Sequence, residues 1–227
     1  MAPRQWQPIV AEFSRVMKLV HLATRMDQVD IDAIASDVFK EKRRAYEDEL
    51  TALSAAVGCV GKIGRADNST LSTMHDESQT EAFGIANTYN YDLALVVRTI
   101  RSEVPTANRY VYAKRIGDWS RTRAEWKSKQ IMLWNTVNWR DKAQKEFIAR
   151  NGLTGYAIVK PRSNPVCDVC RYWVKRGKVS VEEANQMEWP AHLNCPHNWE
   201  YHTKKVTDCD NLWVGLPVKN WYDQVEV

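Results

Sequence analysis

Long apolar runs are what this chain most plainly lacks. No stretch approaches the roughly 18 consecutive apolar residues that a membrane-spanning helix needs, although 44% of the 227 residues are hydrophobic. The first six residues also lack the apolar core of a secretory signal peptide. We therefore expect a protein that is soluble when made, that has no membrane partner, and that has enough apolar residues to pack a core.

The chain also lacks a strong charge of either sign. Its 32 basic residues nearly balance its 28 acidic ones, which leaves a net charge of +4. Such a balance does not require a nucleic-acid partner. The sequence contains no G-x-S-x-G nucleophile motif, no P-loop and no Rossmann glycine pattern. These absences favour a protein that is not an enzyme.

Cysteine is present in small and uneven number. Of the five cysteines, three lie in one C-terminal stretch, while Cys59 and Cys209 have no obvious mates. Unpaired thiols are typical of proteins that fold in a reducing cytoplasm, because disulfides form in oxidising compartments. We therefore expect both residues to be free thiols.

The C-terminal cysteines stand in a pattern that predicts a metal site. Cys167 and Cys170 are two residues apart, and after a spacer of 21 residues come His192, Cys195 and His197. This is the ligand spacing of a tetrahedral zinc site. Three thiolates and one imidazole would fill all four positions and leave none for a catalytic water. We favour His197 as the fourth ligand of a structural zinc ion, with His192 as the alternative.

Other interpretations of the same residues remain open. Cys167 and Cys170 could be small core residues, a redox pair or a disulfide, and both histidines could be surface residues near a turn. A redox C-x-x-C normally opens a helix that follows a strand in a βαβ unit. We expect a tight turn at Cys167–Cys170 instead, which favours the metal site.

Periodicity predicts a mainly helical chain. Apolar residues recur every three or four positions in several segments, and Gly58, Pro105 and the Asn151-Gly152 pair mark helix ends. A flexible connector is expected to run to about Met74, and a turn is expected at Gly117-Asp118. The expected helices span about 8–26, 31–57, 75–103, 106–115 and 120–150.

After Gly152 the pattern changes to short elements. Residues 154–160 and 199–203 alternate as strands do, and 173–179 is typical of a hairpin-like return. Ser180 with Glu183 forms a capping box that opens a helix of about two turns. The expected fold class is therefore mainly α, with long helices followed by short β-hairpins in a small C-terminal α+β module that zinc stabilises.

Tryptophan is unusually frequent. Nine of the ten tryptophans lie between Trp119 and Trp221. Large amphipathic rings suit either a core built from few residues or a surface that other subunits cover. The second interpretation indicates an assembly. The tail after Thr203, through Trp213, Pro217 and Trp221, has the composition of an extended segment that needs a partner to be ordered.

The motifs together resemble a known family. In order, the chain has a helix that carries Arg121-Thr122-Arg123-Ala124-Glu125, an Asn-Gly pair at its end, a short strand, the C-x-x-C pair, a Gly177-Lys178-Val179 turn, and the cluster from His192 to His197. This order is similar to that of the phage minor head proteins of the Mu F type. The resemblance covers roughly residues 115–203. The Arg-Glu motif matches loosely, whereas all the metal donors are kept.

The resemblance implies a function and an organisation. It implies a non-enzymatic virion structural protein for head morphogenesis, placed at the portal vertex or the head-tail connection. Such a protein would be made in the bacterial cytoplasm and then incorporated in several copies, with portal or neck proteins as partners and contact with packaged DNA as an open question. The regions would be a helical part for docking (1–115), the Mu F-like module (116–206) and a tail (207–227).

Two further functions fit parts of the sequence. A zinc-stabilised module could bind nucleic acid through Lys and Arg on the long helix and through stacking tryptophans. An HNH-like nuclease is suggested by His192, His197 and Asn198. That nuclease usually has a second C-x-x-C pair, and this chain has one. The alternative function is therefore a nucleic-acid-binding module or nuclease.

Overall fold

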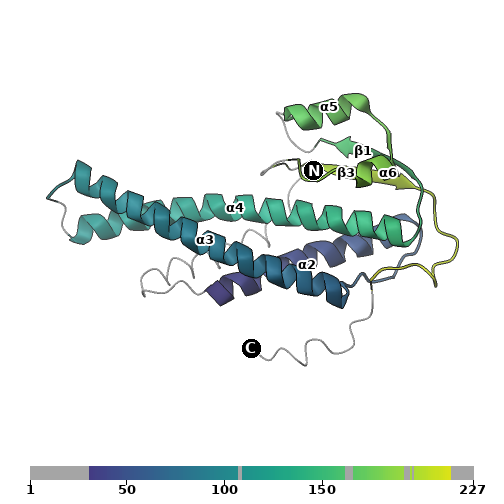
Figure 1. Ribbon diagram of the computed structural model, residues 1–227, viewed down its shortest axis with the longest axis horizontal. Helices are drawn as coiled ribbons and strands as arrows, with labels where there is room; N and C mark the ends of the chain where they lie inside the picture. The colour runs from purple at the N-terminus through teal and green to yellow at the C-terminus, as the bar shows by residue number, and fades with distance from the viewer. Residues whose placement is uncertain (1–30, 107–108, 162–165, 192–194, 196, 216–227) are drawn as a thin grey trace. The chain divides into compact units, whose positions relative to one another are not determined.

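The computed structural model describes residues 31–106, 109–161, 166–191, 195 and 197–215, and these residues are mainly helical (Figure 1). The elements are α2 (Ile31–Ala56), α3 (Asn68–Glu103), α4 (Arg109–Arg150), β1 (Gly155–Lys160), α5 (Asp168–Arg176), β2 (Val179–Ser180), α6 (Val181–Asn185) and β3 (Asn198–Thr203). The predicted helix at 8–26 lies outside the described residues. Among the described helices, none combines the length and the apolar character needed to cross a membrane.

The start and end of α2 were predicted well, but the start of α3 was not. Helix α2 stops at Ala56, just before Gly58. Helix α3 begins at Asn68, so the expected connector is shorter than predicted. The Asp67 carboxylate accepts a hydrogen bond from the Thr70 backbone N–H at 2.8 Å and so caps the first turn of α3.

The predicted turn at Gly117-Asp118 is wrong. Helix α4 runs without a break from Arg109 to Arg150, a length of 42 residues. One glycine inside a helix costs only about 1 kcal/mol relative to alanine, which is small against the packing of so long a helix. The helix ends where Asn151-Gly152 predicted, because Gly152 adopts φ 58° and the Leu153 N–H reaches the Ile148 carbonyl at 3.0 Å.

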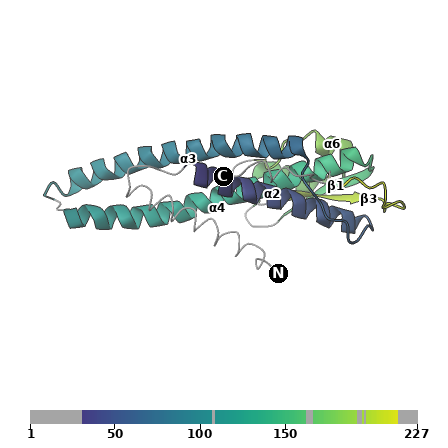
Figure 2. The ribbon, with the colours of Figure 1, turned by 90° about the horizontal axis from the view of Figure 1, so that it is seen from below.

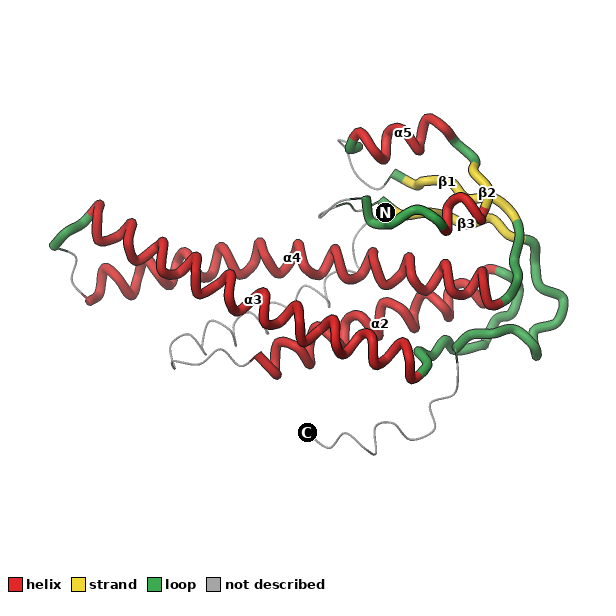
Figure 3. The backbone as a smooth tube through the Cα atoms, in the orientation of Figure 1, coloured by secondary structure: helices red, strands yellow, loops and turns green. Residues whose placement is uncertain are grey.

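The C-terminal module contains a three-stranded antiparallel sheet in the order β2-β1-β3. Figure 3 shows the strands with α5 and α6 beside them. The register pairs Ala157 with both Val179 and Tyr201. The strands predicted at 154–160 and 199–203 are confirmed. The predicted hairpin-like return is wrong, because residues 168–176 form α5 and only Val179 and Ser180 pair with β1.

Helix α5 forms for local reasons that the strand pattern hid. Cys167 caps its first turn, Asp168 places a negative charge near its N-terminus, and Gly177 ends it at φ 77°. Cys170 and Trp173, three residues apart, are both buried on one side of the helix. Amphipathic spacing therefore decides between helix and hairpin here.

The chain divides into two compact units, and each draws on all three long helices. The first comprises Met1–Lys40 and Met74–Met132, and the second comprises Glu41–Thr73 and Leu133–Val227. The three regions expected from the sequence were consecutive, whereas these units are not. In the first unit, α3 and α4 run side by side (Figure 2). Its core consists of Ile34, Ala35, Val38, Ala82 and Tyr89.

The core of the second unit is built around the sheet. It brings together one face of the strands, the buried side of α5 and residues of α4 and α6. Three of its tryptophans, Trp173, Trp189 and Trp199, pack on one another with ring centroids 5.4 to 5.5 Å apart. These tryptophans are thus core residues of a small module, which is the first of the two interpretations that their frequency allowed.

Cys59 and Cys209 were expected to be free thiols, and that prediction is wrong. They form a disulfide with their Cα atoms 5.5 Å apart and 150 residues between them in sequence. The end of α2 meets the segment after β3, where the Val206 N–H donates to the Val57 carbonyl at 2.9 Å. The expectation of a reducing compartment had depended on these two thiols being unpaired, so it loses that support.

Candidate metal centre

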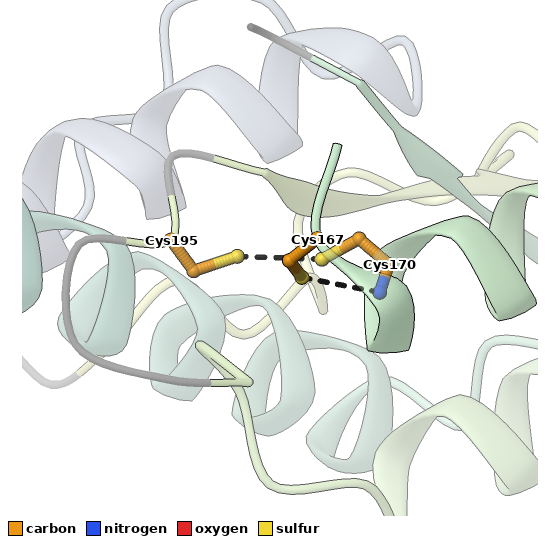
Figure 4. A group of neighbouring side chains, drawn as sticks. All are labelled: Cys167, Cys170 and Cys195. Carbon is orange, nitrogen blue, oxygen red and sulfur yellow. Dashed lines mark hydrogen bonds between the residues drawn. The ribbon is translucent and has the colours of Figure 1, made fainter. Parts of the chain in front are cut away.

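Three of the five predicted metal ligands converge in the structure. The sulfur atoms of Cys167, Cys170 and Cys195 all lie within 4.8 Å of one another. Figure 4 shows that Cys167 and Cys170 approach from the start of α5 and that Cys195 approaches from the segment before β3. The closest pair, Cys170 Sγ and Cys195 Sγ, is 3.4 Å apart. Two segments far apart in sequence therefore present thiols to one point.

The helix start explains how two of the thiols reach the same side. Cys167 is the N-cap of α5 and has extended backbone geometry, while Cys170 lies in the first turn. The Cys170 backbone N–H donates to Cys167 Sγ at 3.3 Å. This hydrogen bond fixes the Cys167 side chain over the helix start. An N–H donor of this kind also stabilises negative charge on sulfur, as metal-bound thiolates require.

The donor set fits a zinc ion. Two thiolates bound tetrahedrally at about 2.3 Å from zinc lie about 3.8 Å apart, which is between the 3.4 Å separation of Cys170 and Cys195 and the 4.8 Å limit of the cluster. Cys170 and Cys195 are buried and Cys167 is partly buried. Soft thiolate donors of this kind select zinc over calcium or magnesium.

Burial also shows what the cation would do. Desolvation, with help from the neighbouring thiols of Cys167 and Cys195, raises the pKa of the Cys170 thiol far above its usual range. Three close thiols in this environment would therefore stay protonated without a cation. A bound divalent ion would supply the positive charge that stabilises their thiolate forms.

The two histidines are not brought together in the same way. His197 is buried, with 1% of its surface exposed, but among the described residues the metal-binding group contains only the three cysteines. Its backbone carbonyl accepts a hydrogen bond from Trp189 Nε1 at 2.6 Å. His192 lies outside the described residues. The fourth ligand is thus open between His192 and His197.

The redox interpretation of Cys167 and Cys170 has to be weighed again on this geometry. We set it aside because such pairs open a helix, and the structure shows that this pair does open α5 after strand β1. What now separates the two interpretations is Cys195. A redox pair needs two thiols, whereas a third thiol within 3.4 Å of Cys170 is what a metal site requires.

An apolar shell surrounds the cluster. Cys170 and Cys195 belong to the same core as Trp173, Trp189 and Trp199. Such a shell keeps water away from the metal-sulfur bonds, and a closed structural site needs this protection. Sequence reasoning found the three thiols from their spacing. It missed that Cys167 is a helix cap, although Asp168 in the first turn and the buried Cys170–Trp173 pair were signals for a helix.

Searches for related proteins returned no match among family models, curated proteins or solved structures.

Proposed function

We propose that the C-terminal module of this protein is held together by a structural zinc ion. The observation that carries this proposal is the convergence of Cys167, Cys170 and Cys195 from two separate segments into one buried cluster. His192 or His197 would complete the tetrahedron. A structural zinc ion contributes folding free energy on the order of 10 kcal/mol, enough to stabilise a three-stranded sheet that has few residues to bury.

We further propose that the whole chain is a non-enzymatic phage structural protein, a minor head protein of the portal vertex or head-tail connection. Support comes from the order of its motifs. The long helix, the Asn-Gly stop, a strand, the C-x-x-C pair, Gly177-Lys178-Val179 and Cys195 follow one another as they do in the Mu F type proteins. A site with four protein ligands leaves no position for a substrate or water, which favours a structural role.

The metal content of variants tests the zinc proposal. We expect Cys170→Ser and Cys195→Ser to lose the stoichiometric zinc of the purified protein, because each removes a ligand. Cys59→Ser and Cys209→Ser serve as matched controls and should keep it. Mass spectrometry under native conditions and elemental analysis would measure this. Equal zinc content in all four variants would contradict the site.

The same measurement identifies the fourth ligand. His192→Ala or His197→Ala, whichever removes the ligand, should lower zinc affinity at least tenfold, while the other should leave it unchanged. For the assembly role, the expected result is incorporation of the chain into purified virions in a fixed ratio to the portal protein. Metal-dependent cleavage of DNA by the isolated chain would instead support the nuclease alternative.

A further inference from the structure

A groove of about 470 Å³ runs along strand β3. All six residues of the strand, Asn198 to Thr203, line it. The remaining lining residues come from the second half of α2, from the end of α4 with the residues after it, and from β1: Glu49, Ala52, Leu53, Ala56, Val57, Gln144, Phe147, Ile148, Leu153 and Lys160. The candidate metal ligands are not among them, so this groove is distinct from the metal centre.

The groove lies at the edge of the sheet. Among the described strands the order is β2-β1-β3, so β3 pairs with β1 on one side only. In an antiparallel pair, every second residue directs its backbone N–H and C=O away from the partner strand. A strand edge of this kind is a template for another extended segment, and proteins normally cover such edges.

The wall opposite the strand leaves room for a chain. It is formed by α2, where Ala52 and Ala56 are small and exposed, and the apolar side chains of Phe147 and Ile148 lie beside it. One side therefore offers backbone hydrogen-bonding groups and the other offers an apolar surface. This combination suits an extended peptide, which uses its backbone for pairing and alternate side chains for packing.

The C-terminal segment of the chain starts near this groove. Trp213 exchanges two hydrogen bonds with the Asn151 side chain, at 2.7 and 3.0 Å, and the Val214 carbonyl accepts from the Arg65 N–H at 2.9 Å. Asn151 is two residues before Leu153, which lines the groove. The described chain stops at Gly215, close to these contacts.

The remaining residues have the length and composition for a strand. Twelve residues follow Gly215, and an extended chain of that length reaches about 40 Å, whereas six strand residues cover only about 20 Å. After Pro217 the segment contains residues that favour strands, namely Val218, Trp221, Tyr222, Val225 and Val227. We propose that residues 218–227 bind in this groove as a fourth strand along the free edge of β3. Tethering favours the chain's own tail, because it gives a high effective concentration.

Hydrogen exchange tests the proposal directly. We expect the outward-facing backbone amides of β3 to exchange at least tenfold more slowly in the full chain than in a chain that ends at Leu216. The amides of α3 serve as the internal control and should not change. Equal exchange of β3 in the two proteins would overturn the proposal.

A pair of substitutions on α2 tests the groove itself. Ala56 lines the groove and Ala55 does not, yet both are exposed. Ala56→Trp should fill the groove and release the tail, so that trypsin cleaves after Lys219 at least five times faster than in the unsubstituted chain. Ala55→Trp should leave the cleavage rate unchanged. Equal rates in the two variants would contradict binding in this groove.

A synthetic peptide of residues 216–227 separates backbone pairing from non-specific contact. Added to the truncated chain, it should restore the slow exchange of β3, whereas the same peptide methylated on alternate backbone nitrogens should not. Restoration by both peptides would contradict strand pairing. The mass in solution should not depend on the tail. An oligomer that becomes a monomer on truncation would assign the strand to a second copy and overturn pairing within one chain.

Discussion

Asp141 is the single residue whose burial has the clearest chemical consequence. It lies on α4 with 3% of its surface exposed, and its Oδ2 is 2.6 Å from Lys145 Nζ. Its other oxygen, Oδ1, is buried and has no hydrogen-bond partner. Burial raises the pKa of this carboxyl group to about 6, and the nearby Lys145 opposes the rise only in part. The folded protein therefore binds a proton at Asp141 more tightly than the unfolded chain does.

This raised pKa predicts a pH dependence of stability with a definite sign. The contribution of protonated Asp141 is fully present below about pH 4 and is lost as the pH rises to about 6. Asp141→Asn should therefore gain stability relative to the unsubstituted protein across this range, by up to about 3 kcal/mol for a two-unit shift. Denaturant unfolding at half-unit pH steps would measure the difference. A difference that stays constant between pH 4 and 7 would contradict the assignment.

Among the short elements, α6 shows how one hydroxyl can set a helix start. Ser180 Oγ accepts the Glu183 N–H at 3.1 Å, as the capping-box pattern predicted. The Glu183 carboxylate instead pairs with Arg176 at 2.6 Å. The helix contains five residues, Val181–Asn185, and is shorter than the two turns expected. So short a helix depends on its cap and on tertiary packing.

Replacing this cap should destabilise the module by a modest amount. Ser180→Ala should lower the free energy of unfolding by about 1 kcal/mol, because the Glu183 N–H loses its acceptor. Ser180→Asp keeps an acceptor and should cost much less. Unfolding by denaturant at saturating zinc would measure both. If the two variants lost the same stability, the effect would come from the β2 pairing of Ser180 and not from the cap.

The elements also show what a single sequence can predict. Helix α2, the end of α4 and strands β1 and β3 follow from periodicity and from Gly, Pro and Asn signals. The start of α3 at Asn68 and the continuity of α4 through Gly117 did not follow, because one cap or one glycine carries a free energy of only about 1 kcal/mol. Tertiary packing outweighs terms of that size. Helix α5 was missed because it shares β-branched and aromatic residues with a strand.

For the candidate site, spacing predicted the three thiols but not their surroundings. Two cysteines three positions apart must be neighbours on a turn or a helix, so Cys167 and Cys170 could be predicted from the sequence alone. The pairing of Cys59 with Cys209 could not, because no local pattern connects residues that are 150 positions apart. Only the fold brings them together.

This disulfide should contribute to the stability of the whole chain. Closing a loop of 150 residues restricts the unfolded chain and is expected to stabilise the folded state by about 3 to 5 kcal/mol. Cys59→Ser with Cys209→Ser should therefore lower the unfolding free energy by this amount and keep the bound zinc. Dithiothreitol should destabilise the unsubstituted protein equally. Loss of zinc in the double variant would show that the two features are coupled.

The same cross-link has a mechanical meaning. Because Cys59 and Cys209 are joined covalently, a force that pulls the two ends of the chain apart passes from α2 through the sulfur bridge to the last residues. The 149 residues between them, including α3, α4 and the cysteine cluster, lie outside that load path. A component of a particle that carries internal pressure could thus bear tension at its ends without stretching the part of the chain that holds its metal.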